Sequence, residues 1–250
     1  MIRSGNEDNF TVDVSDSRGI FIVADGMGGH AAGEVASEMA VQIVQRELTA
    51  IHDLDGEQVA QTVGGALRKA NRAIHDRTLT EVDKQGMGTT VSVLLLSGTR
   101  YLIGQIGDSR VYLLRDGAFT QLTKDHSYVQ EQVDAGFLTP EQARYHPYSN
   151  VITRCVGASS DVEPDIYRGE IRAGDLFLVA SDGLTGMVDD RRLAQLLGSR
   201  AEAERKVHAL ISEANGRGGL DNITAIVVQV ADAGPASDDP DHTREVPPGA

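Results

Sequence analysis

The sequence predicts an α+β fold in which antiparallel sheets are covered by helices. Strand-like segments follow one another with hairpin signals between them, whereas helical segments occur in adjacent pairs. Strands that alternated with single helices would instead predict a doubly wound parallel sheet. The 250 residues suffice for one large domain or two small ones, and they contain no internal repeat.

The first third of the chain contains strand signals and then two amphipathic helices. Residues 20–24 form a short apolar run typical of a buried strand, and residues 6–12 are placed to pair with it as a hairpin. Apolar residues recur at helical spacing over residues 34–48 and again over residues 59–74.

The middle of the chain changes to strand patterns. The segments "TTVSVLLL", "RYLIGQIG" and "SRVYLLR" are strand-like, and "RDGA" supplies the Asp-Gly of a hairpin turn before "FTQLT". Residues 127–136 and 139–145 are short helix candidates. The second begins with Thr139, Pro140 and Gln142, the pattern of a capping box with proline in the first turn.

The last third returns to strands and ends in a polar segment. "DIYRGEI" and "DLFLVAS" are strand-like, helical spacing covers residues 190–214, and "NITAIVVQV" is the last strand. Residues 231–250 are poor in apolar side chains and rich in Pro, Asp and Ala, which predicts a disordered acidic tail. The folded domain is therefore expected to span residues 1–230.

Composition excludes several classes of protein. The 23 basic against 37 acidic residues give a net charge of −14, which opposes binding to nucleic acid or to anionic lipid. The single cysteine, Cys155, excludes an intramolecular disulfide and a cysteine-rich zinc site. No apolar run is long enough to span a membrane and no signal peptide opens the chain, so we expect a cytoplasmic protein.

Four aspartates lie at the ends of apolar strands: Asp25, Asp108, Asp182 and Asp221. Asp-Gly pairs are also ordinary turn chemistry, and for one aspartate alone that explanation would suffice. Four together would repel one another and shift their pKa values unless a cation lay between them. Oxygen ligands favour Mg²⁺ or Mn²⁺ over zinc, and shared carboxylates indicate two ions with a bridging water as nucleophile.

Other chemistries fit the sequence less well. Gly26, Gly28 and Ala31 match a dinucleotide fingerprint, but the second strand that this fingerprint requires does not appear until about Thr89. The residue six positions after Cys155 is not the arginine of a cysteine phosphatase. "GDSRV" lacks the last glycine of a nucleophile elbow, and the chain has no H-E-x-x-H.

Seven segments in order resemble a known family. They are "RSGNED", "VADGMGGHAAGEVAS", "GMGTT", "GDSRVYLLRDG", "LTKDHS", "SDGLT" and "GGLDNITAIVV". Together they are similar to the bacterial metal-dependent protein serine/threonine phosphatases of type 2C, from Arg3 to Val230. The resemblance implies a four-layer α-β-β-α sandwich with two antiparallel sheets, and hydrolysis of phosphoserine and phosphothreonine at a binuclear Mn²⁺ or Mg²⁺ centre.

The resemblance also implies the ligands of the two core ions. Asp25 would bridge them, the carbonyl of Gly26 would hold one, and Asp182 and Asp221 would hold the other. Asp8 would act through metal-bound water. Without a role at the metals, Asp8 could be an ordinary turn residue.

Three further residues carry roles in the family. Asp108 matches the ligand, shared with Asp182, of a third ion in bacterial members. Arg3 matches the arginine that grips the substrate phosphate, although an arginine so near a chain end is often a mobile surface group. His30 matches the histidine proposed to protonate the leaving group, and it could instead only cap the following helix. Only Met1 and Ile2 precede Arg3, where the family usually has a strand of about ten residues, so the first strand is expected to be missing.

Residues 122–150 correspond to a segment, called the flap, that borders the substrate cleft in the family that the chain resembles. The substrate side of the site is therefore expected there. His126, Tyr145, His146 and Tyr148 are candidates for peptide contacts, or solvated loop residues. The expected partners are phosphorylated proteins that a serine/threonine kinase targets, and the protein is expected to be a monomer. Two alternatives are a non-catalytic phosphoprotein-binding module on the same fold and a Mg²⁺-dependent nucleotide hydrolase. The intact carboxylates oppose the first, and the charge of −14 opposes the second.

Overall fold

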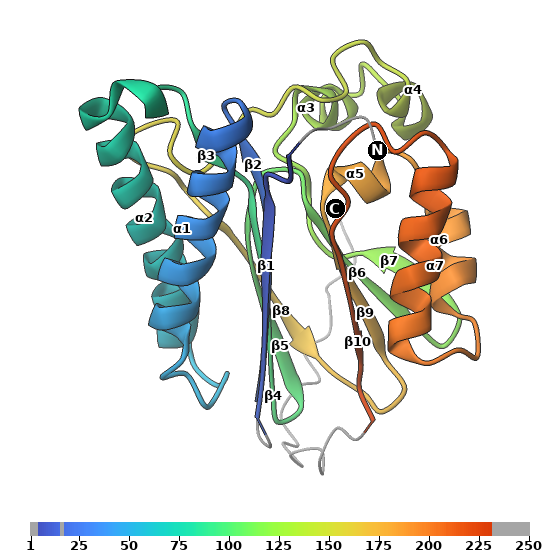
Figure 1. Cartoon of the computed structure of the whole chain (residues 1–250). Helices are drawn as coiled ribbons and strands as arrows, with labels where there is room; N and C mark the ends of the chain where they lie inside the picture. Colours follow the sequence, from blue (N-terminus) through green and yellow to red (C-terminus); the bar gives the residue numbers. More distant parts are fainter. Residues whose placement is uncertain (1–4, 16–17, 232–250) are drawn as a thin grey trace, which may run out of the picture.

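Two antiparallel sheets pack face to face, with helices on both outer faces (Figure 1). The computed structural model describes residues 5–15 and 18–231, apart from the side chains of His30, Ala31 and Glu57. The predicted four-layer sandwich is confirmed. No helix in the described part of the chain is both long and apolar enough to cross a membrane.

The larger sheet has the strand order β1-β2-β4-β5-β8, and β3 also pairs with β2. β1 does pair with β2 as the sequence predicts, with Asp8 opposite Asp25. The six strands are β1 (Asp8–Val14), β2 (Arg18–Met27), β3 (Gly88–Thr89), β4 (Val91–Ser97), β5 (Arg100–Ile106) and β8 (Asp165–Glu170).

The smaller sheet has the order β10-β9-β6-β7. Its strands are β6 (Arg110–Arg115), β7 (Ala118–Gln121), β9 (Leu176–Ala180) and β10 (Ala225–Gln229). Asp116 and Gly117 join β6 to β7 with φ angles of 51° and 81°. Both φ angles are positive, as a two-residue hairpin turn requires, so the Asp-Gly turn is confirmed.

Helices cover both outer faces. α1 (His30–Leu48) and α2 (Glu57–Thr80) pack on the larger sheet, whereas α5 (Asp182–Thr185), α6 (Asp190–Leu197) and α7 (Ala203–Gly216) pack on the smaller one (Figure 1). α3 (Tyr128–Asp134) and α4 (Pro140–Arg144) lie at one end, and a 3₁₀ turn, η1 (Val82–Lys84), follows α2.

Buried side chains alternate between two cores along β2. Ile20 and Ile22 face the helices, whereas Phe21 and Val23 face the opposite sheet. Both faces of this strand are buried, which explains why its sequence is a continuous apolar run instead of an alternating one. A third core joins the smaller sheet to α5, α6 and α7.

One edge of the sandwich is left uncovered by the residues that the structure describes. Phe10 and Val12 pair with Val23 and Phe21, so they point to the face between the sheets. They are nevertheless 59% and 51% exposed, because β10 is the outer strand of the smaller sheet among the described residues and covers β2 but not β1.

Two helix predictions can be compared with the structure. The capping box at Thr139 and Gln142 is present at the start of α4. The single helical run expected over residues 190–214 is wrong, because α6 ends at Leu197 and α7 begins only at Ala203. Gly198 follows the last residue of α6, and glycine is a frequent residue just past a helix end.

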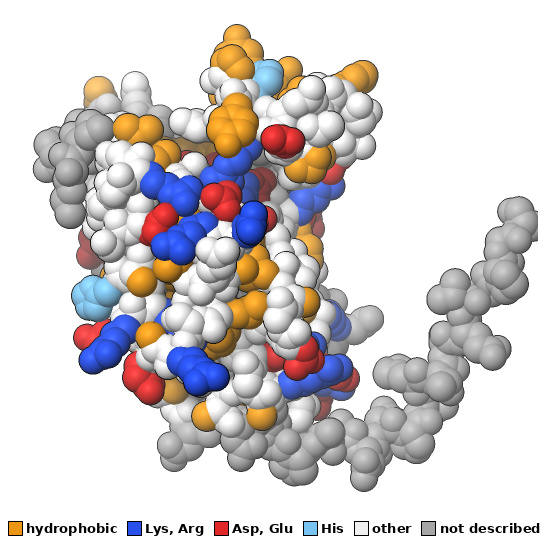
Figure 2. Space-filling model, turned by 90° about the vertical axis from the view of Figure 1, so that its right-hand side faces the viewer, with side chains coloured by type: hydrophobic (Ala, Val, Ile, Leu, Met, Phe, Trp, Pro, Cys, Tyr) orange, Lys and Arg blue, Asp and Glu red, His pale blue; other side chains and the backbone are white. Residues whose placement is uncertain are grey.

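Charges of both signs mix on the outer face of α6 and α7 (Figure 2). Arg192 pairs with Glu213 at 2.8 Å, and Arg217 pairs with Asp189 at 3.1 Å. This face therefore carries no single-signed basic stripe of the kind that binds nucleic acid.

Candidate metal centre

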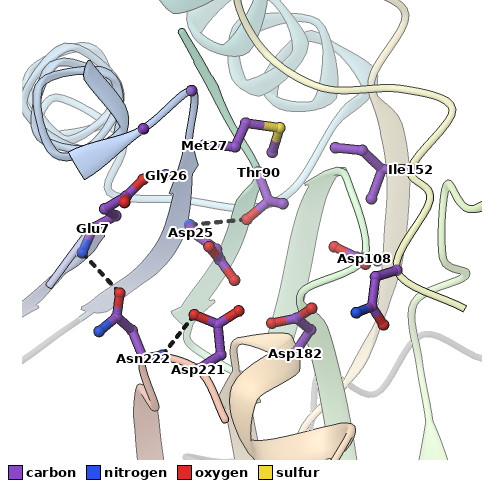
Figure 3. Close-up of a pocket in the computed structure, with 13 residues that line it drawn as sticks. Glu7, Asp25, Gly26, Met27, Thr90, Asp108, Ile152, Asp182, Asp221 and Asn222 are labelled. Atoms are coloured by element: carbon purple, nitrogen blue, oxygen red, sulfur yellow. Dashed lines mark hydrogen bonds between the residues drawn. The ribbon is translucent and has the colours of Figure 1, made fainter. Parts of the chain in front are cut away.

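A pocket of about 300 Å³ lies at one end of the sandwich, between the two sheets (Figure 3). Its walls combine the end of β2, the β5–β6 turn, the start of α5 and the loop before β10. The residues that line it are Glu7, Asp25, Gly26, Met27, Gly28, Gly29, Thr90, Asp108, Asn150, Ile152, Asp182, Asp221 and Asn222.

The backbone around Asp25 is fixed by two threonines. The Asp25 N–H donates to Thr90 Oγ1 at 2.9 Å, and the Asp25 carbonyl accepts from Thr89 Oγ1 at 2.9 Å. The next residue, Gly26, has no room for a side chain, since an added Cβ would overlap the carbonyl of Gly33 in α1. The close approach of α1 to β2 therefore requires glycine at this position.

Tight backbone packing also places the two aspartates on the other sheet. Asp182 is the first residue of α5, and a Cβ on Gly183 would overlap the carbonyl oxygen of Asn222. α5 is thus packed directly against the loop that carries Asp221. Asp108 follows Gly107, whose φ of 105° is unfavourable for other residues and whose Cα lies against Thr90.

Burial and mutual repulsion raise the pKa of the carboxyl groups at this end of the sandwich. Burial raises the pKa of Asp25 well above its usual value, and the charges of Asp182 and Asp8 add to the increase. Burial, followed by the charges of Asp182 and Asp125, raises the pKa of Asp108 to about 8. Without cations the pocket therefore holds protons that ordinary aspartates would have lost.

The donor set fits divalent cations. Among the residues that the structure describes, every charged side chain on the pocket wall is a carboxylate, and the backbone carbonyls of a glycine-rich turn lie beside them. Hard cations such as Mg²⁺ and Mn²⁺ prefer oxygen ligands and would remove the repulsion. Among the described residues, no three such side chains are gathered tightly enough to hold an ion by themselves. Mg²⁺ tolerates such spacing because it keeps several water ligands.

The structure brings five of the eight predicted site residues to one pocket. They are Asp25, Gly26, Asp108, Asp182 and Asp221. Arg3 lies outside the described residues. His30 is the first residue of α1, and its side chain is also outside the described part.

Asp8 lies beside the pocket but does not line it. Its Oδ2 accepts hydrogen bonds from Ser181 Oγ at 2.8 Å and from Thr224 Oγ1 at 2.7 Å. Burial raises the Asp8 pKa to about 6, and these two hydrogen bonds oppose the increase. Asp8 therefore ties the larger sheet to the smaller one.

Sequence reasoning did not single out four polar residues of the pocket: Glu7, Thr90, Asn150 and Asn222. Glu7 and Asn222 are direct neighbours of predicted residues, in "NED" and "LDN". Their positions next to Asp8 and Asp221 are the signal that could have found them.

A second cavity, of about 1020 Å³, continues from the first and shares Asp108, Asn150 and Asp182 with it. α3, α4 and the loop after α5 form much of its wall. Arg144 in α4 donates to the Gly186 carbonyl at 3.4 Å, so this cavity lies between the flap and the body of the domain.

The flap carries an exposed aromatic group. The rings of Tyr128, His146 and Tyr148 lie 5.6 to 6.0 Å apart, and hydrophobic side chains mark the projecting end of the molecule in Figure 2. Tyr145 is 79% exposed, so it and Tyr148 are available for peptide contacts.

His126 is different from the other flap residues. Its side chain is buried, and its Nδ1 accepts from the Gly107 N–H at 3.0 Å. The expectation that His126 contacts peptide is wrong, because the ring is committed to the turn that carries Asp108.

Comparisons with known proteins agree with this geometry. A family model described as protein phosphatase 2C matches residues 3–214. The serine/threonine phosphatase stp of Listeria monocytogenes is 39% identical over 232 residues, covering 91% of each chain. The serine/threonine protein phosphatase PstP of Mycobacterium tuberculosis is 41% identical over 232 residues, which are 93% of this chain and 43% of PstP.

Solved structures show the same similarity. The serine/threonine phosphatase of S. agalactiae superposes with a TM-score of 0.85 at 37% identity, covering 91% of this chain and 94% of that one. The catalytic domain of PstP in complex with two manganese ions gives a TM-score of 0.81 at 39% identity, covering 93% and 94%.

Proposed function

Since this chain belongs to the protein phosphatase 2C family, we propose that the pocket between its two sheets is the active site of a metal-dependent protein serine/threonine phosphatase. The reaction is hydrolysis of phosphoserine and phosphothreonine in proteins, with Mn²⁺ or Mg²⁺ as cofactor. The family match and the relatives do not support a binding module or a nucleotide hydrolase.

The residues that would hold the ions come from both sheets. Asp25 would be shared between two ions, with the Gly26 carbonyl on one of them and Asp182 and Asp221 on the other. Asp108 would hold a third ion together with Asp182. When bound, the ions supply positive charge and lower the pKa of a water molecule.

Glu7 is better placed than Asp8 for a contact through water. Glu7 lines the pocket, whereas the Asp8 carboxylate already accepts two hydroxyl hydrogen bonds. We therefore assign the water-mediated contact to Glu7 and a bracing role to Asp8.

Two residues would act on the substrate itself. Arg3 would bind the phosphate oxygens through its planar guanidinium, and His30 would protonate the departing serine or threonine oxygen. Both assignments rest on the family resemblance of "RSGNED" and "MGGH".

The observation that carries the site assignment is the convergence of carboxylates from four separate segments on one pocket, where the pKa values of Asp25 and Asp108 are raised. Asp182→Asn tests it, because a neutral amide cannot replace the charge of a shared ligand. We expect loss of phosphothreonine-peptide hydrolysis even at high Mn²⁺ and a weaker calorimetric Mn²⁺ isotherm. Asp76→Asn, on the outer helix α2, is the matched control. Full activity in Asp182→Asn would contradict the assignment.

We assign residues 1–230 as the catalytic unit. We assign phosphorylated targets of a serine/threonine kinase as its substrates. The fold supports this boundary, because Val230 N still donates to the Asp175 carbonyl at 2.9 Å. The monomeric state, the cytoplasmic location and the disorder of residues 231–250 stay predictions.

A further inference from the structure

The side chain of Asn222 joins the two ends of the described chain at the pocket (Figure 3). Its Oδ1 accepts from the Glu7 N–H at 3.0 Å, and its Nδ2 donates to the Gly5 carbonyl at 2.9 Å. One amide thus pairs with two backbone groups of a segment that lies 215 residues away in the sequence.

A neutral amide side chain offers a donor and an acceptor side by side. The backbone partners fix its orientation, because the Glu7 N–H can only donate and the Gly5 carbonyl can only accept. The contact therefore resembles one step of a β-ladder, in which a side chain takes the place of a neighbouring strand.

Asn222 is also tied to the proposed metal ligands. Its backbone N–H donates to Asp221 Oδ1 at 2.8 Å, and its carbonyl packs against Gly183, next to Asp182. On the other side, the Glu7 carbonyl accepts from the Gly26 N–H at 3.1 Å and from Ser37 Oγ at 2.6 Å. Asn222 is thus the direct link between ligands on the smaller sheet and segment 5–7.

We propose that Asn222 is a positioning residue for substrate phosphate binding, because its amide sets segment 5–7 at the wall of the metal pocket. This inference rests on the proposed function. It assigns to Asn222 no contact with substrate or metal. The Asn222 amide fixes the position of the Gly5–Glu7 backbone and of the residues that this segment carries toward the pocket.

The variant Asn222→Ala separates this role from metal binding. It removes both side-chain hydrogen bonds but keeps the backbone N–H that orients Asp221. We expect KM for a phosphothreonine peptide to rise about tenfold, since a misplacement of about 1 Å costs up to about a hundredfold. The Mn²⁺ dissociation constant, measured by calorimetry, should rise by clearly less than KM, because no direct ligand is removed and Glu7 is assigned a contact with the ions only through water.

Asn71 offers a matched control. Its Oδ1 accepts from the Gly157 N–H at 2.7 Å and its Nδ2 donates to the Ser159 carbonyl at 2.9 Å, which is the same pairing in a loop outside the pocket. Asn71→Ala should lower the melting temperature at least as much as Asn222→Ala and leave KM unchanged.

Hydrogen exchange supplies a readout that needs neither metal nor activity. In the metal-free protein, exchange of the Glu7 amide should accelerate about tenfold in Asn222→Ala, because its acceptor is gone. In Asn71→Ala the Gly157 amide should accelerate instead. Asn222→Gln keeps the amide but lengthens the side chain, so its KM should lie between the KM values of the wild type and of Asn222→Ala. If Asn222→Ala does not fold, Asn222→Gln is compared with Asn71→Ala in the same way.

The outcomes separate the two proposals. Wild-type protein without Mn²⁺-dependent phosphatase activity would overturn the proposed function. An active wild type in which the Asn222 variant has unchanged KM, or an unchanged Glu7 exchange rate, would overturn the positioning role alone. A loss of Mn²⁺ affinity equal to the rise in KM would also overturn it, since Asn222 would then act through the metal ligands.

Discussion

Raising the pH should destabilise the metal-free protein, and the pocket carboxylates set the size of this effect. The pKa of Asp108 is about 8 in the folded chain, against 3.8 for the free side chain. Between these values the folded protein keeps a proton that the unfolded chain has lost. The stabilisation from this group is therefore fully present below about pH 4 and is lost as the pH rises toward 8.

One extra proton in the folded state changes the free energy of unfolding by about 1.4 kcal/mol per pH unit. The titration belongs to the cluster, since the charge of Asp182 acts on both Asp25 and Asp108. Burial lowers the pKa of His126, so the stability from this group increases with pH up to about 6.5. Just above pH 6.5 this increase offsets a few tenths of a kcal/mol of the stability that is lost with the carboxyl proton. From pH 6.5 to 7.5 we therefore expect a net loss of about 1 kcal/mol.

Urea unfolding in the presence of a chelator, at pH 6.5 and 7.5, measures this loss. Asp108→Asn should reduce the pH dependence, because its amide cannot titrate, whereas Asp76→Asn should leave it unchanged. Saturating Mn²⁺ should reverse the trend, because cations compete with the protons, and should add about 2.7 kcal/mol per site at a hundredfold excess over Kd. A metal-free protein that is equally stable at both pH values would refute the electrostatic account of the pocket.

Three further variants test individual features. His30→Ala should slow hydrolysis of a phosphoserine peptide more than that of an aryl phosphate, because only the alkoxide needs a proton to leave; equal losses would oppose the general-acid role. Gly183→Ala should cost about 1 to 3 kcal/mol in urea unfolding and weaken Mn²⁺ binding, because the new methyl group overlaps the Asn222 carbonyl; unchanged binding would show that the loop yields freely. Phe10→Thr with Val12→Thr should change the free energy of unfolding in urea by less than about 0.5 kcal/mol, because both side chains are more than half exposed; a large loss of stability would mean that they are covered in solution.

Local patterns were sufficient to predict most of the fold. The helices of the first half and the Asp-Gly turn at Asp116 depend on spacing and turn chemistry within a few residues, and both are confirmed. The break between α6 and α7 was missed because the apolar spacing continues across it. The four strand-end aspartates were found because each follows an apolar run that is visible in the sequence.

Contacts between distant segments could not be predicted. The Asn222 amide meets Gly5 and Glu7 only because the two sheets pack together, and no local pattern encodes that pairing. His126 was assigned to the substrate side because its neighbours are flap residues. Its ring instead reaches back to Gly107, which only the folded backbone places beside it.

The order of the pocket residues along the chain has a consequence for biosynthesis. Asp25 comes from β2, whereas Asp221 lies in the loop before β10. During translation, nearly the whole domain is synthesised before Asp221 and Asn222 are added to the chain. Long-range pairing of this kind therefore forms late. If Asp221 is a ligand as we propose, an unfinished chain should be inactive toward phosphoproteins, and cations should bind only after the two sheets have packed together.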